Sequence, residues 1–109
     1  MLDPIVKVSE TLQRPGNVAV EILDISSSVT PHVGASRMTL PPNATSKLDL
    51  HDAEEIWFVG SGNGEFHLED EVFKVAAPQV LAIPKRHKHQ IINTGQSALV
   101  IYSIWWPVG

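Results

Sequence analysis

The sequence of 109 residues contains no cysteine. A disulfide, a thiolate nucleophile and a thiolate metal site are therefore excluded, which leaves histidine and carboxylate side chains as the available metal ligands. No stretch approaches the roughly 18 apolar residues that a membrane-spanning helix needs. The segment that begins at Met1 also lacks the basic and apolar regions of a signal peptide. We therefore expect a soluble, cytoplasmic protein with no membrane partner.

Basic residues are scarce, since 8 Lys and Arg stand against 12 Asp and Glu, for a formal net charge of -4. The longest basic cluster runs only from Lys85 to Lys88. The chain thus lacks the electrostatic footprint of a nucleic-acid-binding protein, and we expect no nucleic-acid partner. Its length suits one domain with one core, so residues 1–109 are predicted to form a single domain.

Regular helix signals are missing as well. Eight Pro and seven Gly divide the chain into short apolar segments, and none of these shows a sustained 3.6-residue period with caps. Short β-branched and aromatic segments at regular spacing predict about nine or ten strands in an all-β barrel or sandwich. The predicted strands are 17–25, 35–40, 46–51, 56–59, 65–69, 72–75, 80–83, 89–92 and 98–106, so the barrel core covers about 17–106.

Turn residues separate these strands. A Ser-rich loop is predicted at Ser26 to Ser28. The Asn63-Gly64 pair is a strong signal of a two-residue hairpin turn, and it predicts that strands 56–59 and 65–69 are paired. Glu69 to Glu71 is predicted to be the polar tip of the following hairpin.

Two short stretches carry most of the side chains suited to metal chemistry. His51 lies four residues before Glu55, and His89 lies in the later stretch Pro84 to Asn93. Two imidazoles and one carboxylate can hold a divalent metal and leave coordination positions open for substrate or dioxygen. If the later stretch is extended, His87 shares a face with His89 and is a further candidate ligand.

The local structure around the first stretch has two interpretations. On a helix, His51 and Glu55 would share one face. In a strand followed by a bend and a second strand, Lys47, Asp49 and His51 would point to one side and Glu55 would return beside them. Lys47 would then face the interior, where a buried ammonium needs a partner such as Asp49. If Lys47 has a functional role, we expect it to hold an anionic substrate or to shuttle a proton.

Both stretches resemble the two motifs of the cupins, G-x5-H-x-H-x3,4-E-x6-G and G-x5-P-x-G-x2-H-x3-N. The matching positions are His51, Glu55 and Gly62 in the first motif, and Pro84, His89 and Asn93 in the second. The resemblance covers roughly residues 35 to 104. It implies a single cupin barrel, the double-stranded β-helix that is also called a jelly roll.

The chain departs from these motifs at four positions. Asn43 and Pro78 stand at the opening glycines of the two motifs, Asp49 stands at the leading histidine, and Arg86 stands at the inner glycine. Asparagine can adopt the left-handed conformation that a glycine position often requires, so the change at Asn43 is mild. The change at Asp49 concerns the metal site directly.

The resemblance implies a metal site, because the motif histidines and the glutamate coordinate a metal in cupins. The implied ligands are His51, Glu55 and His89. Asp49 is either a fourth ligand or an acceptor that orients an imidazole. Such a donor set suits Fe, Mn or Ni at least as well as Zn. Glu55 and Lys47 are the candidate catalytic residues.

The C-terminal segment from Leu99 to Trp106 is apolar at both its odd-numbered and its even-numbered positions, apart from Ser103. In a strand, these positions face opposite sides of the sheet. A strand with one face in a core would alternate, so the second face needs cover too. A partner subunit would supply this cover, and we therefore predict a homodimer. Trp105 or Trp106 either packs in the core or the dimer interface, or lines the substrate cavity.

Two functional hypotheses follow. The first is a metal-dependent cupin enzyme that acts on a small oxygenated metabolite, either as a dioxygenase or as an isomerase, lyase or cyclase that uses the metal as a Lewis acid. The second is a metal-free cupin that binds a small ligand or serves as an interaction module. Metal content distinguishes the two.

Overall fold

The computed structural model describes residues 3–25 and 32–107, so the predicted Ser26 to Ser28 loop lies outside the described residues. The described strands are β1 (Lys7–Arg14), β2 (Val18–Asp24), β3 (Gly34–Leu40), β4 (Ala53–Ser61), β5 (Asn63–Leu68), β6 (Glu71–Ala76), β7 (Gln79–Ile83), β8 (His89–Asn93) and β9 (Leu99–Pro107). A short 3-10 turn, η1 (Pro15–Asn17), joins β1 to β2. The all-β fold predicted from the sequence is confirmed. In this part of the chain, no helix is long and apolar enough to cross a membrane.

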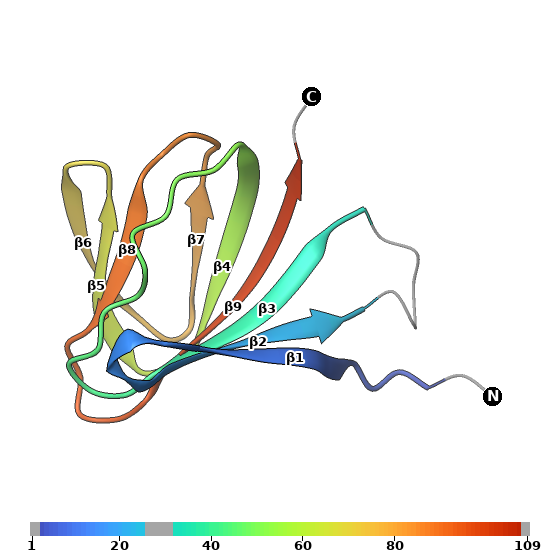
Figure 1. The fold of residues 1–109 in the computed structure, drawn as a ribbon. Helices are drawn as coiled ribbons and strands as arrows, with labels where there is room; N and C mark the ends of the chain where they lie inside the picture. The colour runs from blue at the N-terminus through green and yellow to red at the C-terminus, as the bar shows by residue number, and fades with distance from the viewer. Residues whose placement is uncertain (1–2, 26–31, 108–109) are drawn as a thin grey trace.

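The strands form two antiparallel sheets (Figure 1). One has six strands in the order β1-β2-β3-β9-β4-β7, and the other has three in the order β6-β5-β8. Figure 1 shows the segment between β3 and β4, in green, running along β8. This segment lies opposite the curved sheet that β9, β3, β2 and β1 form.

The segment between β3 and β4 is extended but is not a regular strand. Isolated bridges hold it to β8, and one of them joins Asp49 to His89. The ladder is interrupted because the Ser46 hydroxyl, rather than a backbone carbonyl, accepts the N–H of Ile91 (2.9 Å). The predicted strand 46–51 is therefore wrong as a regular element. The helical alternative is also wrong, because the chain passes through an extended segment and a bend into β4.

The Asn63-Gly64 pair opens β5 and does not form a hairpin turn, so the predicted pairing of β4 with β5 is wrong. β4 pairs with β7 and β9, whereas β5 pairs with β6 and β8. The chain crosses between the sheets at Gly62, whose φ is 87°. A Cβ at this position would lie 2.6 Å from the carbonyl oxygen of Ala98. Glycine fits the crossing because it has no side chain and tolerates the left-handed conformation.

The barrel begins earlier than predicted, because β1 precedes residue 17. Seven of its eight side chains are exposed, and the other, Leu12, is half-buried. β1 is an edge strand that pairs only with β2. Its sequence therefore lacks the apolar alternation by which strands are recognised.

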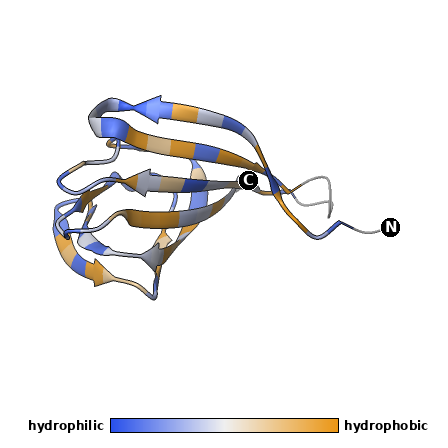
Figure 2. Ribbon diagram, turned by 90° about the horizontal axis from the view of Figure 1, so that it is seen from below, coloured by the Kyte–Doolittle hydropathy of each residue, from blue (hydrophilic) through white to orange (hydrophobic). Residues whose placement is uncertain are grey.

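Alternating side chains build the core between the sheets. On β9, Leu99, Ile101 and Ser103 are buried, whereas Tyr102 is exposed. Figure 2 shows hydrophobic and hydrophilic residues interspersed along the strands, as this alternation requires. The largest fully buried side chains are Leu40, Ile83, Ile91, Leu99, Ile101, Val18, Val59 and Asn93. Except for Asn93 these side chains are apolar, and their removal from water is the main force that stabilises the barrel.

Candidate metal centre

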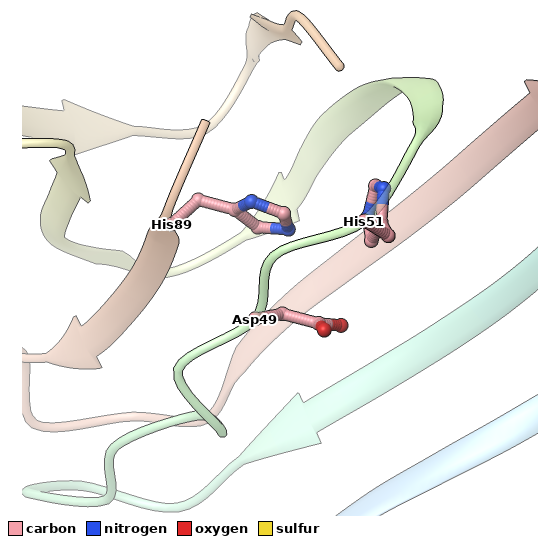
Figure 3. A group of neighbouring side chains, drawn as sticks. All are labelled: Asp49, His51 and His89. Atoms are coloured by element: carbon pink, nitrogen blue, oxygen red, sulfur yellow. The ribbon is translucent and has the colours of Figure 1, made fainter. Parts of the chain in front are cut away.

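Neighbouring segments of the chain bring three of the predicted ligands together. Asp49 and His51 lie on the segment that runs along β8, and His89 is the first residue of β8. Backbone hydrogen bonds of 3.0 Å run in both directions between Asp49 and His89. One potential ligand atom from each residue lies within 4.8 Å of the other two. Figure 3 shows the three side chains extending from these segments into the same space.

Glu55, on β4, lies outside this group of three, but its carboxylate contacts both imidazoles. Its Oε1 atom lies 3.0 Å from Nε2 of His51 and 3.5 Å from Nε2 of His89. Its side chain is buried, as is that of His89. The neighbouring Glu54 points to the other side of β4, because successive side chains of a strand alternate. Glu55, the residue that fits the motif spacing, is therefore the one that faces the site.

Hydrogen bonds fix the orientation of the two rings. Nδ1–H of His51 donates to the carbonyl of Ala53 (3.0 Å), and Nδ1–H of His89 donates to the carbonyl of His87 (2.8 Å). A carbonyl only accepts, so each Nδ1 carries a proton. Each Nε2 is then left to face the carboxylate of Glu55, the arrangement in which imidazole ligands are usually held.

When both imidazoles are neutral, three acceptor atoms converge, because a neutral imidazole and an ionised carboxylate both present lone pairs. Such a cluster requires a cation, either a proton or a metal ion. Burial raises the pKa of Glu55, but the side chains of His89, Trp57 and His51 outweigh burial and lower it below its ordinary value. Burial lowers the pKa of His89, but the Glu55 carboxylate and the His87 carbonyl raise it overall. The two directions favour an ionised Glu55 carboxylate and a positive charge on His89 beside it.

Aromatic rings surround the buried end of the site. The ring of His89 lies edge-on to those of Trp57 and His51, with centroids 5.6 and 5.0 Å away. Trp57 also packs against Phe66. The indole N–H of Trp57 is buried without a hydrogen-bond partner among the described residues, although it helps to lower the pKa of Glu55. Sequence reasoning did not identify Trp57, which reads as an ordinary core residue in its strand.

Lys47 differs from its prediction. The side chain is exposed, and no ion pair joins it to Asp49 within the described residues. The expectation of a buried ammonium paired with Asp49 is therefore wrong, because the flexible stem of lysine allows its charge to stay in water. Lys47 nevertheless lines the cavity that contains the candidate ligands. His87 is not part of the group of clustered ligand atoms, and its Nδ1 donates to the carbonyl of Lys85 (2.9 Å).

Arg86 supports the segment that carries His51. Its backbone N–H donates to the His51 carbonyl (2.8 Å), and its Nε donates to Oδ1 of Asp52 (2.7 Å). Its φ of 61° is left-handed, as is the φ of 69° at Asn43. Both residues stand where the cupin motifs have glycine. The backbone conformation that glycine favours is thus retained at both positions, and the Arg86 side chain adds a contact that glycine could not make.

The candidate ligands line a cavity of about 440 Å³. Trp105 lines it too, whereas Trp106 does not. Gly34 permits this position, since a Cβ there would clash with the Trp105 indole. For Trp105, the structure therefore supports the predicted alternative in which the ring lines the cavity.

Comparison with known proteins agrees with this geometry. Residues 36–105 match the Cupin_2 model, described as a cupin domain. The chain is a cupin. An oxalate-binding protein of Thermotoga maritima is 30% identical over 95 residues, which cover 84% of this chain and 78% of that protein.

Solved structures share the cupin barrel. A crystal structure of a predicted oxalate decarboxylase from T. maritima superposes with a TM-score of 0.78 at 24% identity, over 95% of this chain and 99% of that one. A Cupin 2 conserved barrel domain protein from Salinispora arenicola gives a TM-score of 0.79 at 21% identity, over 92% of this chain and 83% of that one. At these identities the likeness establishes the fold.

Proposed function

We propose that this cupin binds one divalent first-row metal ion through His51, His89 and Glu55, with Asp49 as a fourth ligand, and acts on a small oxygenated metabolite. The observation that carries the proposal is the convergence of two Nε2 atoms on one carboxylate oxygen, while both Nδ1 atoms already donate to backbone carbonyls. A metal ion resolves this arrangement, because it accepts lone pairs from all of them. Fe, Mn and Ni suit a set with two carboxylates at least as well as Zn.

The bound metal would supply Lewis-acid or oxygen-activating chemistry. The protein's own residues hold the imidazoles in one tautomer, through the carbonyls of Ala53 and His87. Trp57, which packs against Phe66, covers one side of the cavity with an apolar ring. Lys47, at the edge of the cavity, is placed to attract an anionic substrate or to exchange a proton with it. The two oxalate-related names among the relatives agree with an oxygenated ligand.

A direct experiment is a titration of oxalate into protein reconstituted with Co(II). We expect the visible spectrum to change with saturation, because oxalate would enter the open coordination positions. The metal-free protein should bind oxalate more weakly in calorimetry. If the visible spectrum of bound Co(II) does not change with oxalate or other small carboxylates, the proposal is contradicted. That result would favour the alternative, a metal-free cupin that binds a ligand or partner.

Substitutions of Asp49 test whether it is a ligand. Asp49→Ala should weaken metal binding strongly if the carboxylate coordinates, and by about 10- to 100-fold if it only orients an imidazole. Asp49→His should retain the metal, because it restores a nitrogen donor at the motif position. Competition titration against a chromophoric chelator measures both. Asp70→Ala, at an exposed turn, is the control, and an Asp49→Ala variant that matches this control would exclude both roles.

We also propose that the chain is a homodimer. Phe58, Val80 and Tyr102 lie side by side on the outer face of the six-stranded sheet and are 40%, 60% and 39% exposed. Sedimentation equilibrium should give roughly twice the chain mass, and Val80→Lys should shift the protein towards monomer. The exposed Gln96→Lys change should not. A monomeric wild-type protein at high micromolar concentration would contradict the prediction.

A further inference from the structure

The cavity wall opposite the candidate ligands is a continuous apolar surface. Strand register places four side chains in one row, with Leu12 beside Val20, Val20 beside Met38, and Met38 beside Ile101. All four line the cavity. The row crosses β1, β2, β3 and β9, which form the curved sheet of Figure 1.

Two serine hydroxyls on this wall are hydrogen-bonded to each other. Ser36 and Ser103 are paired across β3 and β9, and their hydroxyl oxygens lie 2.7 Å apart. Both residues are buried. A ligand that contacts the wall therefore meets mainly apolar side chains, and each of the two hydroxyls already takes part in one hydrogen bond.

The four side chains of the row are uncharged, and the charged groups of the cavity lie beside the row or across from it. The carboxylates and imidazoles lie on the side of β8 and β4. Two cationic side chains that line the cavity, Arg14 and Lys47, are exposed. A bound divalent ion would add further positive charge. Among the described residues, the cavity thus combines a region that holds both carboxylates and cations with a row of four uncharged apolar side chains.

Oxalate would use only part of this space. The cavity volume of about 440 Å³ corresponds to roughly 15 water molecules at about 30 Å³ each. A two-carbon dianion at the candidate ligands would leave the apolar row in contact with water, which is unfavourable. Pockets that bind organic ligands usually place apolar walls against an apolar part of the ligand.

We propose that the ligand is an amphipathic carboxylic acid. Its carboxylate lies at the candidate metal centre, and an aliphatic or aromatic body of about ten non-hydrogen atoms packs against Leu12, Val20, Met38 and Ile101. The position of the carboxylate rests on the proposed function. The position of the apolar body rests on the wall alone.

The test compares 4-phenylbutyrate with acetate, which carries the same carboxylate without the body. Calorimetry on Mn(II)-reconstituted protein should give 4-phenylbutyrate an affinity at least about tenfold higher than that of acetate. Binding of the larger acid should also show a negative heat-capacity change. Val20→Phe fills part of the cavity and should abolish this advantage while it leaves acetate binding unchanged. Ala19→Phe, of opposite parity on the same strand, should keep it.

The outcomes separate the two proposals. If the protein binds no metal but still prefers 4-phenylbutyrate, and loses that preference in Val20→Phe, the apolar subsite stands and the metal proposal fails. If the protein binds metal and acetate but shows no preference for the larger acid, the amphipathic ligand is excluded and the metal proposal stands. Thermal unfolding shows whether the Val20→Phe variant is folded. If that variant is not folded, Ile22→Phe, which changes another residue of the same wall, is tested in its place.

Discussion

Replacement of His89 by alanine should lower the affinity for a divalent metal by more than about 100-fold. The variant removes a buried imidazole whose Nε2 faces Glu55 and whose Nδ1–H is bound by the His87 carbonyl. Loss of a residue that only orients a ligand typically costs 10- to 100-fold, so loss of a ligand should cost more. Competition between the protein and a chromophoric chelator for Co(II) or Zn(II) measures the change.

His51→Ala should have an effect of similar size, because its Nε2 lies 3.0 Å from the same carboxylate oxygen. His32→Ala is the matched control, since His32 is exposed and lies outside the candidate site. Circular dichroism should show that each variant keeps its sheet content. Equal metal affinity in His89→Ala and in His32→Ala would exclude His89 as a ligand.

Replacement of Asn93 by alanine should destabilise the protein by about 3 to 5 kcal/mol. Asn93 is completely buried. Its amide donates to the carbonyls of Leu40 and Ser97, and its Oδ1 accepts the N–H of Gly95, each at 2.9 Å. Alanine would remove the side-chain partner of the buried Leu40 carbonyl, and of the part-buried Ser97 carbonyl and Gly95 N–H. Urea unfolding of both proteins measures the difference.

Two further variants make the test for Asn93 specific. Thr94→Ala alters the adjacent exposed residue and should change stability by less than about 0.5 kcal/mol. Asn93→Asp should also be destabilising, because a carboxylate would face the two carbonyls of Leu40 and Ser97. A loss of less than about 1 kcal/mol in Asn93→Ala would show that water replaces the amide.

The clustering of Asp49, His51 and His89 was predictable because the sequence signal is local at each of them. The spacing of His51, Glu55 and His89 matches the cupin motifs, and strand parity selects the side of the chain on which each side chain lies. The hairpin tip at Glu69 was also predicted correctly, since Leu68 and Glu71 are paired across a two-residue turn. The alternation of side chains along one strand does not predict that Glu55 contacts both imidazoles, because these come from two other segments of the chain.

Other features depend on distant parts of the chain. The Asn63-Gly64 pair is a hairpin signal on its own, but the chain changes sheets at Gly62, so the local signal is overruled by tertiary structure. Lys47 is at an odd-numbered position like Asp49 and His51, which predicts that it faces the interior. Its long, flexible side chain nevertheless keeps the ammonium group in water. The apolar row of the cavity includes Leu12 of β1, a strand whose exposed sequence carries no recognisable pattern.

Elemental analysis of untagged protein is the most direct test of the central claim, that this cupin has a metal centre. The protein would be stripped with a chelator, reconstituted separately with Fe, Mn, Ni, Co and Zn, and freed of unbound metal. We predict about one metal ion per chain for at least one of these metals, and its loss in His51→Ala and His89→Ala. Wild-type protein that stays empty with all five metals would contradict the claim.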